Sequence, residues 1–206
     1  MAFDDFLEDA KLHIETTGRD DSCETLNVRA YEPTSYSVLE RIFEEGCISS
    51  GDHLIDYGSG KGRVCIFFSD RTGCKAAGIE LVRKFYEKAR ENLRSYIKNS
   101  SKEADIEFFN EKAQDFELPD TASVLFFFNP FSHKTFRAVM KRVTESYDRA
   151  PRLIRLFFYY PENAYIAYLS GLDHIMFYDE IDCRDLFSEE DDRNRVIIFE
   201  MGQDLQ

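Results

Sequence analysis

Residues 53–63 hold the feature that most constrains the fold of this chain: a short apolar run, an acid, and glycines at alternate positions. The acid is Asp56. The glycines are Gly58, Gly60 and Gly62. The apolar run predicts a buried strand, and the glycines predict a tight turn because they accept positive φ angles. The apolar residues 64–68 then predict the start of a helix, whose free N–H groups can bind an anionic group. The pattern therefore indicates an α/β protein with a ligand at this turn.

The spacing of the glycines separates two classes of nucleotide. The dinucleotide fingerprint G-x-G-x-x-G needs a glycine at position 63, where the chain has Arg63. A second apolar run, residues 74–79, ends at Glu80. An acid about 20 residues beyond such a turn is placed to bind the ribose hydroxyls of a nucleoside. The glycine turn, its strand and Glu80 together resemble the motifs of class I S-adenosylmethionine (SAM) methyltransferases, which implies SAM as the cofactor.

Strand-like runs alternate with helical patterns along the rest of the chain. Further strands are predicted at residues 106–110, 124–131, 152–161, 175–178 and 196–201. Helices are predicted at residues 82–97, from Ser132 onward, and at 165–169. No linker or low-complexity segment divides these elements. The alternation predicts a three-layer, doubly wound, mostly parallel sheet. The resemblance implies the seven-stranded class I methyltransferase variant of that fold, with a reversed last strand.

The N-terminal residues 1–46 are expected to form a helical extension that covers the cofactor cleft, and residues 47–206 a single SAM-binding domain. Apolar residues at helical spacing predict an amphipathic helix within residues 1–22, stopping at Gly18. Those apolar residues are Phe3, Phe6, Leu7, Ala10 and Ile14. The alternative is that this helix simply packs on the domain without a role at the cleft.

A second N-terminal helix is expected just before the glycine turn. Pro33 disfavours a helical conformation at the residue before it, and Thr34 is expected to cap the helix that follows. Gly46 is expected to end that helix. Tyr31 and its neighbours are either a simple helix entrance or a segment that closes over bound SAM.

The fourth strand ends in a polar residue at the edge where α/β sheets bind ligands. Residues 124–128 form a continuous apolar run, typical of a central strand that is covered on both faces, and Asn129, Pro130 and Phe131 follow. The amide of Asn129 is expected to accept a hydrogen bond from an attacking amine. Pro130 and Phe131 are expected to shape a slot for that amine.

The third strand is followed by a segment that methyltransferases of this class use for the adenine ring. Here that segment ends in Asp115 and Phe116. The carboxylate is expected to accept the exocyclic amine, and the ring to stack on the base. The alternative is that Phe116 is only a core residue.

The order of motifs from Tyr31 to about residue 143 is similar to that of the non-SET, seven-strand histone lysine methyltransferases. The matching motifs are Tyr31 with Thr34–Ser35, Asp56–Gly62, Gly78–Glu80, Asp115–Phe116, and Asn129 with Phe131. The resemblance implies that Thr34, Asp56, Gly58, Ser59, Gly60, Gly62, Glu80, Asp115, Phe116 and Asn129 bind the cofactor. It also implies that Asn129, Phe131 and Tyr31 act at the reacting group. The chain further resembles uncharacterised bacterial class I methyltransferases with a Phe-Asn-Pro-Phe fourth strand.

Composition narrows the range of partners. The formal net charge is −13, which argues against nucleic acid because binding to phosphates is driven by Lys and Arg. The five cysteines show no C-x-x-C spacing and the four histidines are scattered, so we expect no metal site and no disulfide framework. No apolar run reaches membrane-spanning length, and we expect a cytoplasmic protein.

The sequence therefore predicts a SAM-dependent methyltransferase that acts on an amine-type acceptor, with a protein lysine side chain as one candidate. Three alternatives stay open at this point. A small-molecule acceptor would use the same motifs, and a SAM-binding or nucleotide-binding module without catalysis would share the cofactor site. A nicotinamide-dependent oxidoreductase would use the same sheet but lacks its glycine at position 63.

Overall fold

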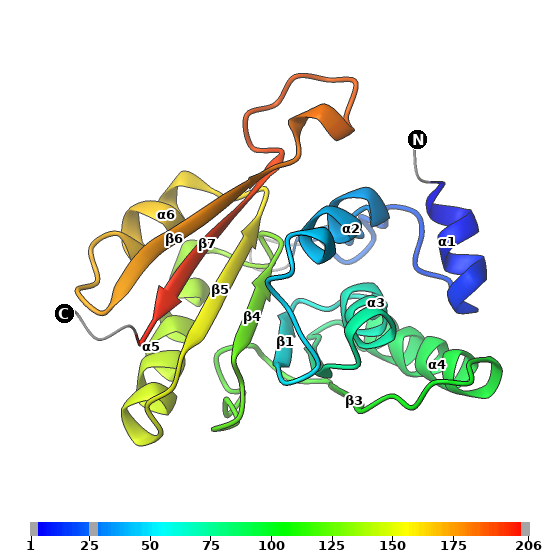
Figure 1. Cartoon of the computed structure of the whole chain (residues 1–206), viewed down its shortest axis with the longest axis horizontal. Helices are drawn as coiled ribbons and strands as arrows, with labels where there is room; N and C mark the ends of the chain where they lie inside the picture. Colours follow the sequence, from blue (N-terminus) through cyan, green and yellow to red (C-terminus); the bar gives the residue numbers. More distant parts are fainter. Residues whose placement is uncertain (1–3, 25–28, 203–206) are drawn as a thin grey trace.

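A seven-stranded sheet with the strand order β3-β2-β1-β4-β5-β7-β6 forms the centre of the molecule (Figure 1). The structure is a computed structural model that describes residues 4–24 and 29–202. The strands are β1 (His53–Tyr57), β2 (Lys75–Ile79), β3 (Ile106–Phe109), β4 (Val124–Phe127), β5 (Ile154–Tyr159), β6 (Ile175–Asp182) and β7 (Arg195–Met201). The first five strands are parallel to one another, whereas β7 pairs antiparallel with both β5 and β6. The predicted fold class and the reversed last strand are confirmed.

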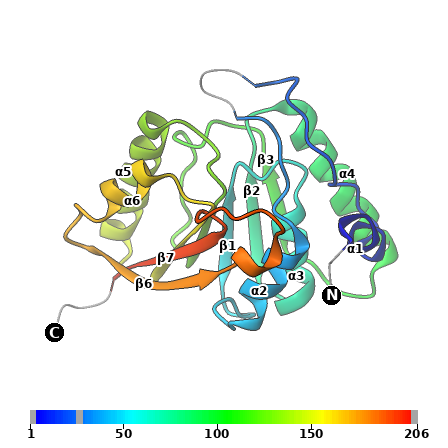
Figure 2. The same cartoon turned by 90° about the horizontal axis from the view of Figure 1, so that it is seen from above.

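Helices cover both faces of this sheet (Figure 2). They are α1 (Asp5–Leu12), α2 (Tyr36–Glu44), α3 (Arg63–Thr72), α4 (Arg83–Asn99), α5 (His133–Arg149) and α6 (Asn163–Leu169), with a short 3₁₀ helix η1 (Arg184–Leu186). Side chains of α2, α3 and α4 share one buried apolar cluster with alternate residues of the strands. Side chains of α5 and α6 share a second cluster on the opposite face. Strand β1 shows the alternation directly, because Leu54 belongs to the first cluster and Ile55 to the second.

The strand order reverses at β1, and this reversal positions the site. Strand β1 pairs with β2 on one side and with β4 on the other. The connections that leave the carboxyl ends of β1 and β4 therefore diverge toward opposite faces, which opens a crevice between them. The glycine turn and the Asn129–Phe131 segment both start at that crevice.

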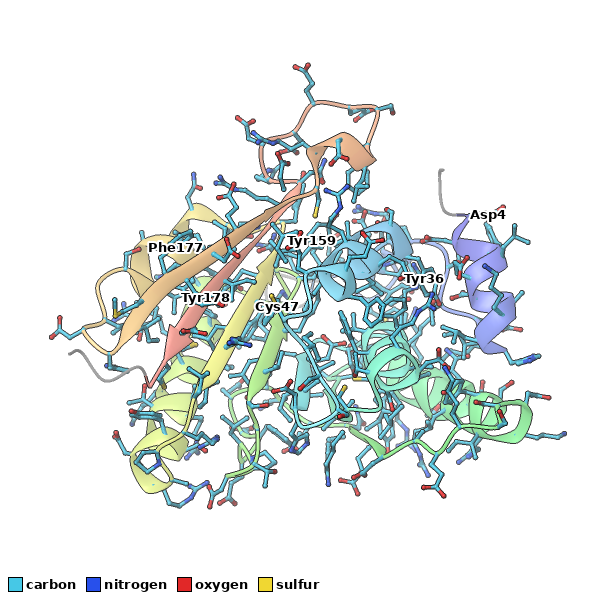
Figure 3. All side chains as sticks on the ribbon, in the orientation of Figure 1. Asp4, Tyr36, Cys47, Tyr159, Phe177 and Tyr178 are labelled. Carbon is cyan, nitrogen blue, oxygen red and sulfur yellow. The ribbon has the colours of Figure 1, made fainter. Side chains whose placement is uncertain are left out.

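Three predicted element boundaries were wrong. Strand β4 ends at Phe127, four residues before the predicted end at position 131, because Asn129 has a φ of 40° and turns the chain away from the sheet. Helix α2 begins at Tyr36 with Ser35 as its N-cap, so Thr34 does not cap it. Strand β6 continues to Asp182, four residues beyond the predicted end at position 178, because it pairs with β7 along this length. Its Phe177 and Tyr178 are 60% and 43% exposed (Figure 3).

The first helix also differs from its prediction. It ends at Leu12 rather than near Gly18, with His13 in the left-handed conformation as its C-cap. Only part of the predicted apolar stripe faces the domain, because Phe6 is 72% and Leu7 60% exposed, whereas Ile14, just beyond the helix, is 4% exposed. The buried residues of α1 are the acids Glu8 and Asp9. Phe3, which the prediction placed on this helix, lies outside the described residues.

Candidate functional site

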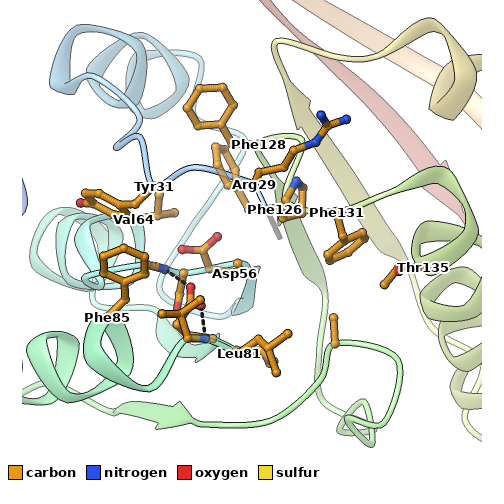
Figure 4. Close-up of a pocket in the computed structure, with 18 of the residues that line it drawn as sticks. Arg29, Tyr31, Asp56, Val64, Leu81, Phe85, Phe126, Phe128, Phe131 and Thr135 are labelled. Carbon is orange, nitrogen blue, oxygen red and sulfur yellow. Dashed lines mark hydrogen bonds between the residues drawn. The ribbon is translucent and has the colours of Figure 1, made fainter. Parts of the chain in front are cut away.

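A cavity of about 660 Å³ opens at the carboxyl ends of β1, β2 and β4 (Figure 4). Its walls come from residues 29–34, the glycine turn, the start of the β2–α4 connection, residues 111–114, and the β4–α5 connection with the first turns of α5. Its size lies in the range of small-molecule and cofactor sites. Segments that are far apart in the sequence thus meet at the reversal of the strand order.

The glycine turn is held tightly against the end of β2. The backbone N–H groups of Gly58 and Ser59 both donate to the carbonyl oxygen of Ile79, at 2.9 and 3.0 Å. A Cβ atom on Gly58 would lie 2.5 Å from the Cβ of Pro130, and one on Gly60 2.4 Å from the ring of Tyr31. Both glycines have positive φ angles. Only glycine therefore allows the turn to approach both cavity walls this closely.

Glu80 is fixed by backbone donors on both of its oxygens. The N–H of Val82 donates to Oε1 at 2.6 Å, and the N–H of Gly60 donates to Oε2 at 2.9 Å (Figure 4). The residue is 8% exposed and lines the cavity. Burial raises the pKa of Glu80, and the two N–H groups oppose this rise. Each oxygen keeps a further lone pair, so this rigid carboxylate can accept hydrogen bonds from a diol in the cavity.

Asp56 is a second buried carboxylate in the same cavity. It is 4% exposed, and it accepts no hydrogen bond from the residues that the structure describes. Burial raises the pKa of Asp56 to about 8, and the charge of Glu80 adds to the rise. A buried carboxylate without a partner is costly, so this position favours a cationic or hydrogen-bond-donating ligand group.

Tyr31 lies in the cavity wall, but its hydroxyl is occupied. The hydroxyl donates to the carbonyl oxygen of Thr16 at 2.5 Å, and its ring lies 4.9 Å from the ring of Phe85. Burial raises the pKa of Tyr31 far above its ordinary value. The side chain is therefore placed to close the wall over Gly60 and is poorly suited to take up a proton.

Asn129 does not line the cavity, although the residues on both sides of it do. Its amide group donates through Nδ2 to the carbonyl oxygen of Tyr160 and accepts through Oδ1 from the N–H of Glu162, at 3.2 Å for the latter. The side chain thus ties the β4–α5 connection to the β5–α6 connection. Phe131 is 6% exposed and lines the cavity, and its role in an acceptor slot stays a prediction.

Three other predicted cofactor residues lie outside the cavity lining. Asp115 is exposed, and Phe116 is buried against Tyr57 and Phe109. Both residues line a separate cavity of about 270 Å³. Residues 111–114 line the large cavity in their place. Gly62 instead serves packing, because a Cβ there would lie 2.6 Å from the ring of Phe108. Thr34 and Ser59 do line the cavity and are buried.

Sequence reasoning missed several residues of the cavity wall. Arg63 was noted only as a break in the dinucleotide fingerprint, yet it is 2% exposed and lines the cavity. Leu81 was also missed. Its position directly after Glu80 was the one signal in the sequence that could have identified it as a cavity residue. Arg29, Lys112 and Lys134 also line the cavity and gave no signal in the sequence.

The described residues contain neither a candidate metal site nor a candidate membrane-spanning helix. Within residues 4–24 and 29–202, no cluster of three or more His, Cys, Asp or Glu side chains is placed to hold a metal ion. In the same part of the chain, no helix is both long and apolar enough to cross a membrane.

Several solved structures with the same fold are methyltransferases. An RNA methyltransferase from Salinibacter ruber in complex with S-adenosylhomocysteine (SAH) matches 85% of this chain and 97% of its own, with 17% identity and a TM-score of 0.54. An rRNA methylase from Streptococcus thermophilus matches 84% and 100%, with 11% identity and a TM-score of 0.56. The magnesium protoporphyrin IX methyltransferase of Synechocystis PCC 6803 with bound SAM matches 80% and 76%, with 15% identity and a TM-score of 0.54. At these identities the matches show the fold.

The sequence itself identifies the family. No curated protein matches the chain closely enough to count as a relative. The model of the family described as "Histone methylation protein DOT1" matches residues 22–156, which is more than half of the chain. That segment contains the glycine turn, both cavity carboxylates and the Asn129–Phe131 segment. The chain therefore belongs to the DOT1 family of histone methylation proteins and is, as its sequence predicted, a SAM-dependent class I methyltransferase.

Proposed function

We propose that this chain transfers a methyl group from SAM to an amine-type acceptor, such as a protein lysine side chain, inside the large cavity. The observation that carries the proposal is the division of one cavity into two ends. Buried carboxylates lie at one end, and the aromatic residues Phe128 and Phe131 lie at the other (Figure 4). The first end suits the polar groups of SAM, and the second suits an uncharged nucleophile.

The residues at the first end fit the cofactor. Asp56 has no partner in the described chain, and we assign it to the ammonium group of the methionine part. Glu80 is held rigidly by two N–H groups, and we assign it to the ribose hydroxyls. Gly58 and Gly60 leave the space for the methionine part that a Cβ would fill. The adenine is assigned to Leu81 and residues 111–114 rather than to Asp115 and Phe116, because only the former line this cavity.

We assign no general base at the acceptor end. Among the described residues that line the cavity there is no histidine or cysteine, and the hydroxyl of Tyr31 is held by Thr16. An amine must therefore lose its proton by desolvation. The apolar surfaces of Phe128, Pro130 and Phe131 disfavour the charged ammonium form and so lower the pKa of a bound amine. When bound, SAM supplies a methyl group on a sulfonium leaving group, so the chain has mainly to position the amine and exclude water.

Two further sequence assignments change at the acceptor end. Asn129 holds the wall of the acceptor end in place, because its amide is bound by Tyr160 and Glu162 and it does not line the cavity. Tyr31 closes the wall over the glycine turn. The acceptor contacts are assigned to Phe131 and its neighbours Phe128 and Pro130. The family description supports a protein acceptor, and the net charge of −13 supports an acceptor other than nucleic acid.

The test is transfer of radiolabelled methyl groups from SAM into a cell lysate. We expect label in protein that is stable to mild base and is recovered as N-methylated lysine after acid hydrolysis. Phe131→Ala should lower the incorporation by about tenfold or more because the amine loses its apolar slot. The matched control Phe177→Ala removes an exposed phenylalanine on β6, far from the cavity lining, and should change nothing.

Other outcomes would redirect the proposal. Label confined to metabolites would identify a small-molecule methyltransferase, and label lost on nuclease treatment would identify a nucleic-acid acceptor. Tight SAH binding without any incorporation would favour a binding module. Equal incorporation by the Phe131→Ala and Phe177→Ala variants would remove Phe131 from the acceptor site.

A further inference from the structure

Arg63 joins the start of α3 to several N-terminal segments that precede it in the chain. It is the first residue of α3, directly after the glycine turn, and it is 2% exposed. Its Nε donates to the Thr16 hydroxyl at 2.6 Å, and its Nη2 donates to the Thr17 hydroxyl at 3.0 Å. Its Nη1 donates to the Asp5 carboxylate at 2.5 Å and to the carbonyl oxygen of Thr34 at 3.0 Å. The buried guanidinium of Arg63 therefore donates hydrogen bonds to three separate stretches of the chain.

Asp9 forms the other half of this cluster. Its carboxylate lies 3.6 Å from the Arg63 guanidinium and accepts hydrogen bonds from both the backbone and the hydroxyl of Thr16. The hydroxyl of Tyr36 also donates to it, at 2.7 Å, and the ring of Tyr36 lies 4.3 Å from the guanidinium carbon. Figure 3 shows Tyr36 between α2 and α1. Asp9 is 4% exposed and Arg63 2%, so the contact between these two residues is shielded from water.

These polar contacts are what hold α1 in place. The exposed positions of Phe6 and Leu7 mean that the helix buries little apolar surface, and its buried residues are Glu8 and Asp9. The stretch that follows α1 is tied down in the same way, because the hydroxyl of Tyr31 donates to the carbonyl oxygen of Thr16. We call residues 5–17 and 31–36 the N-terminal cover. Its attachment combines the Arg63 cluster with the apolar contacts of Ile14 and Tyr36, which belong to the buried cluster on that face of the sheet.

The same cover forms part of the cavity wall. Tyr31, Pro33 and Thr34 line the cavity, and Arg63 reaches the carbonyl oxygen of Thr34 from the neighbouring helix. A cofactor in this cavity would touch the cover on one side and the glycine turn on the other. Asp5 and Asp9 do not line the cavity. Any effect of these two acids on cofactor affinity must therefore pass through the cover.

We propose that Arg63, through its buried contacts with Asp5, Asp9, Thr16 and Thr34, is a positioning residue that couples closure of the N-terminal cover to cofactor binding. The proposal rests on the proposed function, because it takes the cofactor to be SAM. A ligand that contacts the closed cover stabilises it, and by reciprocity a loosened cover lowers the affinity for the ligand. The expectation that residues 1–46 cover the cleft gains support from the same contacts.

The test compares three acid-to-amide variants on one helix. Asp9→Asn and Asp5→Asn remove a charge that faces Arg63, and Glu8→Gln is the matched control because Glu8 pairs with Lys11 instead. Two quantities are measured for each: the Kd for SAH by calorimetry, and the rate of tryptic cleavage after Lys11 with and without saturating SAH. Circular dichroism establishes that each variant is folded at the assay temperature. The partly exposed Asp5 provides the milder variant if Asp9→Asn does not fold.

The proposal predicts that SAH slows cleavage of the wild-type cover. It predicts that Asp9→Asn raises the Kd for SAH by about tenfold and speeds cleavage, as expected for a coupling between two sites. Glu8→Gln should leave both quantities within about twofold of wild type, because the ion pair of Glu8 is with Lys11 and not with Arg63. Faster cleavage in both Asn variants with an unchanged Kd for SAH would overturn the coupling alone. Failure of the wild type to bind SAH would overturn the proposed function, and the coupling with it.

Discussion

Two carboxylates in one cavity show how the surroundings of a residue decide its chemistry. Glu80 has a backbone N–H on each oxygen, whereas Asp56 accepts no hydrogen bond from the described residues. Both are buried, and burial raises the pKa of each. Glu80 is therefore already held in one orientation, as its proposed role at the ribose requires. Asp56 depends on a ligand to supply its partner, and it should lower the stability of the protein when no ligand is bound.

Asp56 leads to a prediction about pH. Its pKa is about 8 in the folded protein against an ordinary value of 3.8, so between these values the folded protein binds a proton that the unfolded chain lacks. Stability should then fall as the pH rises through this window. Asp56→Asn, which stays neutral, should raise the free energy of unfolding at pH 8.5 by roughly 2 kcal/mol or more, and by less at pH 6. Urea unfolding at the two pH values measures this difference.

The same substitution should cost cofactor affinity. The neutral amide cannot form an ion pair with the ammonium group of SAH. We therefore expect the Kd of the variant for SAH to rise while the protein becomes more stable. A variant that is no more stable than the wild type at pH 8.5 would contradict the pKa of Asp56. A stabilised variant with unchanged SAH affinity would contradict its assignment to the ammonium group.

At the scale of elements, the connection after β4 is held by a pair of strained residues. Asn129 and Tyr160 both have positive φ angles, of 40° and 51°, and the side chain of the first donates to the carbonyl oxygen of the second. Asparagine tolerates this conformation better than most residues. The hydrogen bonds of Asn129 to the β5–α6 connection therefore fix where Pro130 and Phe131 enter the cavity.

Asn129→Ala tests this role. It removes both side-chain hydrogen bonds and leaves a residue that tolerates a positive φ poorly, so it should lower the free energy of unfolding by about 2 kcal/mol. Methyl transfer should fall because Phe131 is no longer positioned, whereas the Kd for SAH should stay near the wild-type value. Denaturant unfolding, calorimetry and label incorporation measure the three quantities. Loss of SAH binding in a folded variant would instead place Asn129 at the cofactor.

Sequence patterns predicted most elements because each central strand is an apolar run, and every residue of β1 and β4 is buried. The patterns failed where tertiary contacts override them. Strand β6 extends into acidic residues because β7 pairs with them and because Arg195 forms an ion pair with Glu180 at 3.1 Å. An edge strand can carry charge in this way, and its composition then resembles a loop.

At the scale of the whole molecule, the cavity joins segments that the sequence separates widely. The acid and glycine spacing was enough to predict Asp56, Glu80 and the turn, because those residues share one βαβ unit. It could not predict that Asp115 and Phe116 lie outside the cavity, or that Arg63 binds Asp5, 58 residues upstream. Contacts of this kind depend on how helices dock on the sheet, which periodicity does not encode.

These long-range segments meet at the glycine turn. Substitutions in this turn therefore test whether the cavity binds SAM. Gly60 has a φ of 53°, and a Cβ there would lie 2.4 Å from the ring of Tyr31. Gly46 also has a positive φ, of 68°, but a Cβ there would meet nothing within 4 Å. Replacing each with alanine imposes a similar backbone strain of about 1 kcal/mol. Only the change at Gly60 should also push the cavity wall away from the turn.

The assignment of this turn to SAM is tested by calorimetric titration with SAH and with NAD. The proteins titrated are the wild type, Gly60→Ala and Gly46→Ala. We predict that the wild type and Gly46→Ala bind SAH equally, that Gly60→Ala binds it at least about tenfold more weakly, and that none of them binds NAD. Binding of NAD in place of SAH by the wild type, or an unchanged affinity for SAH in Gly60→Ala, would contradict the assignment of this turn to SAM.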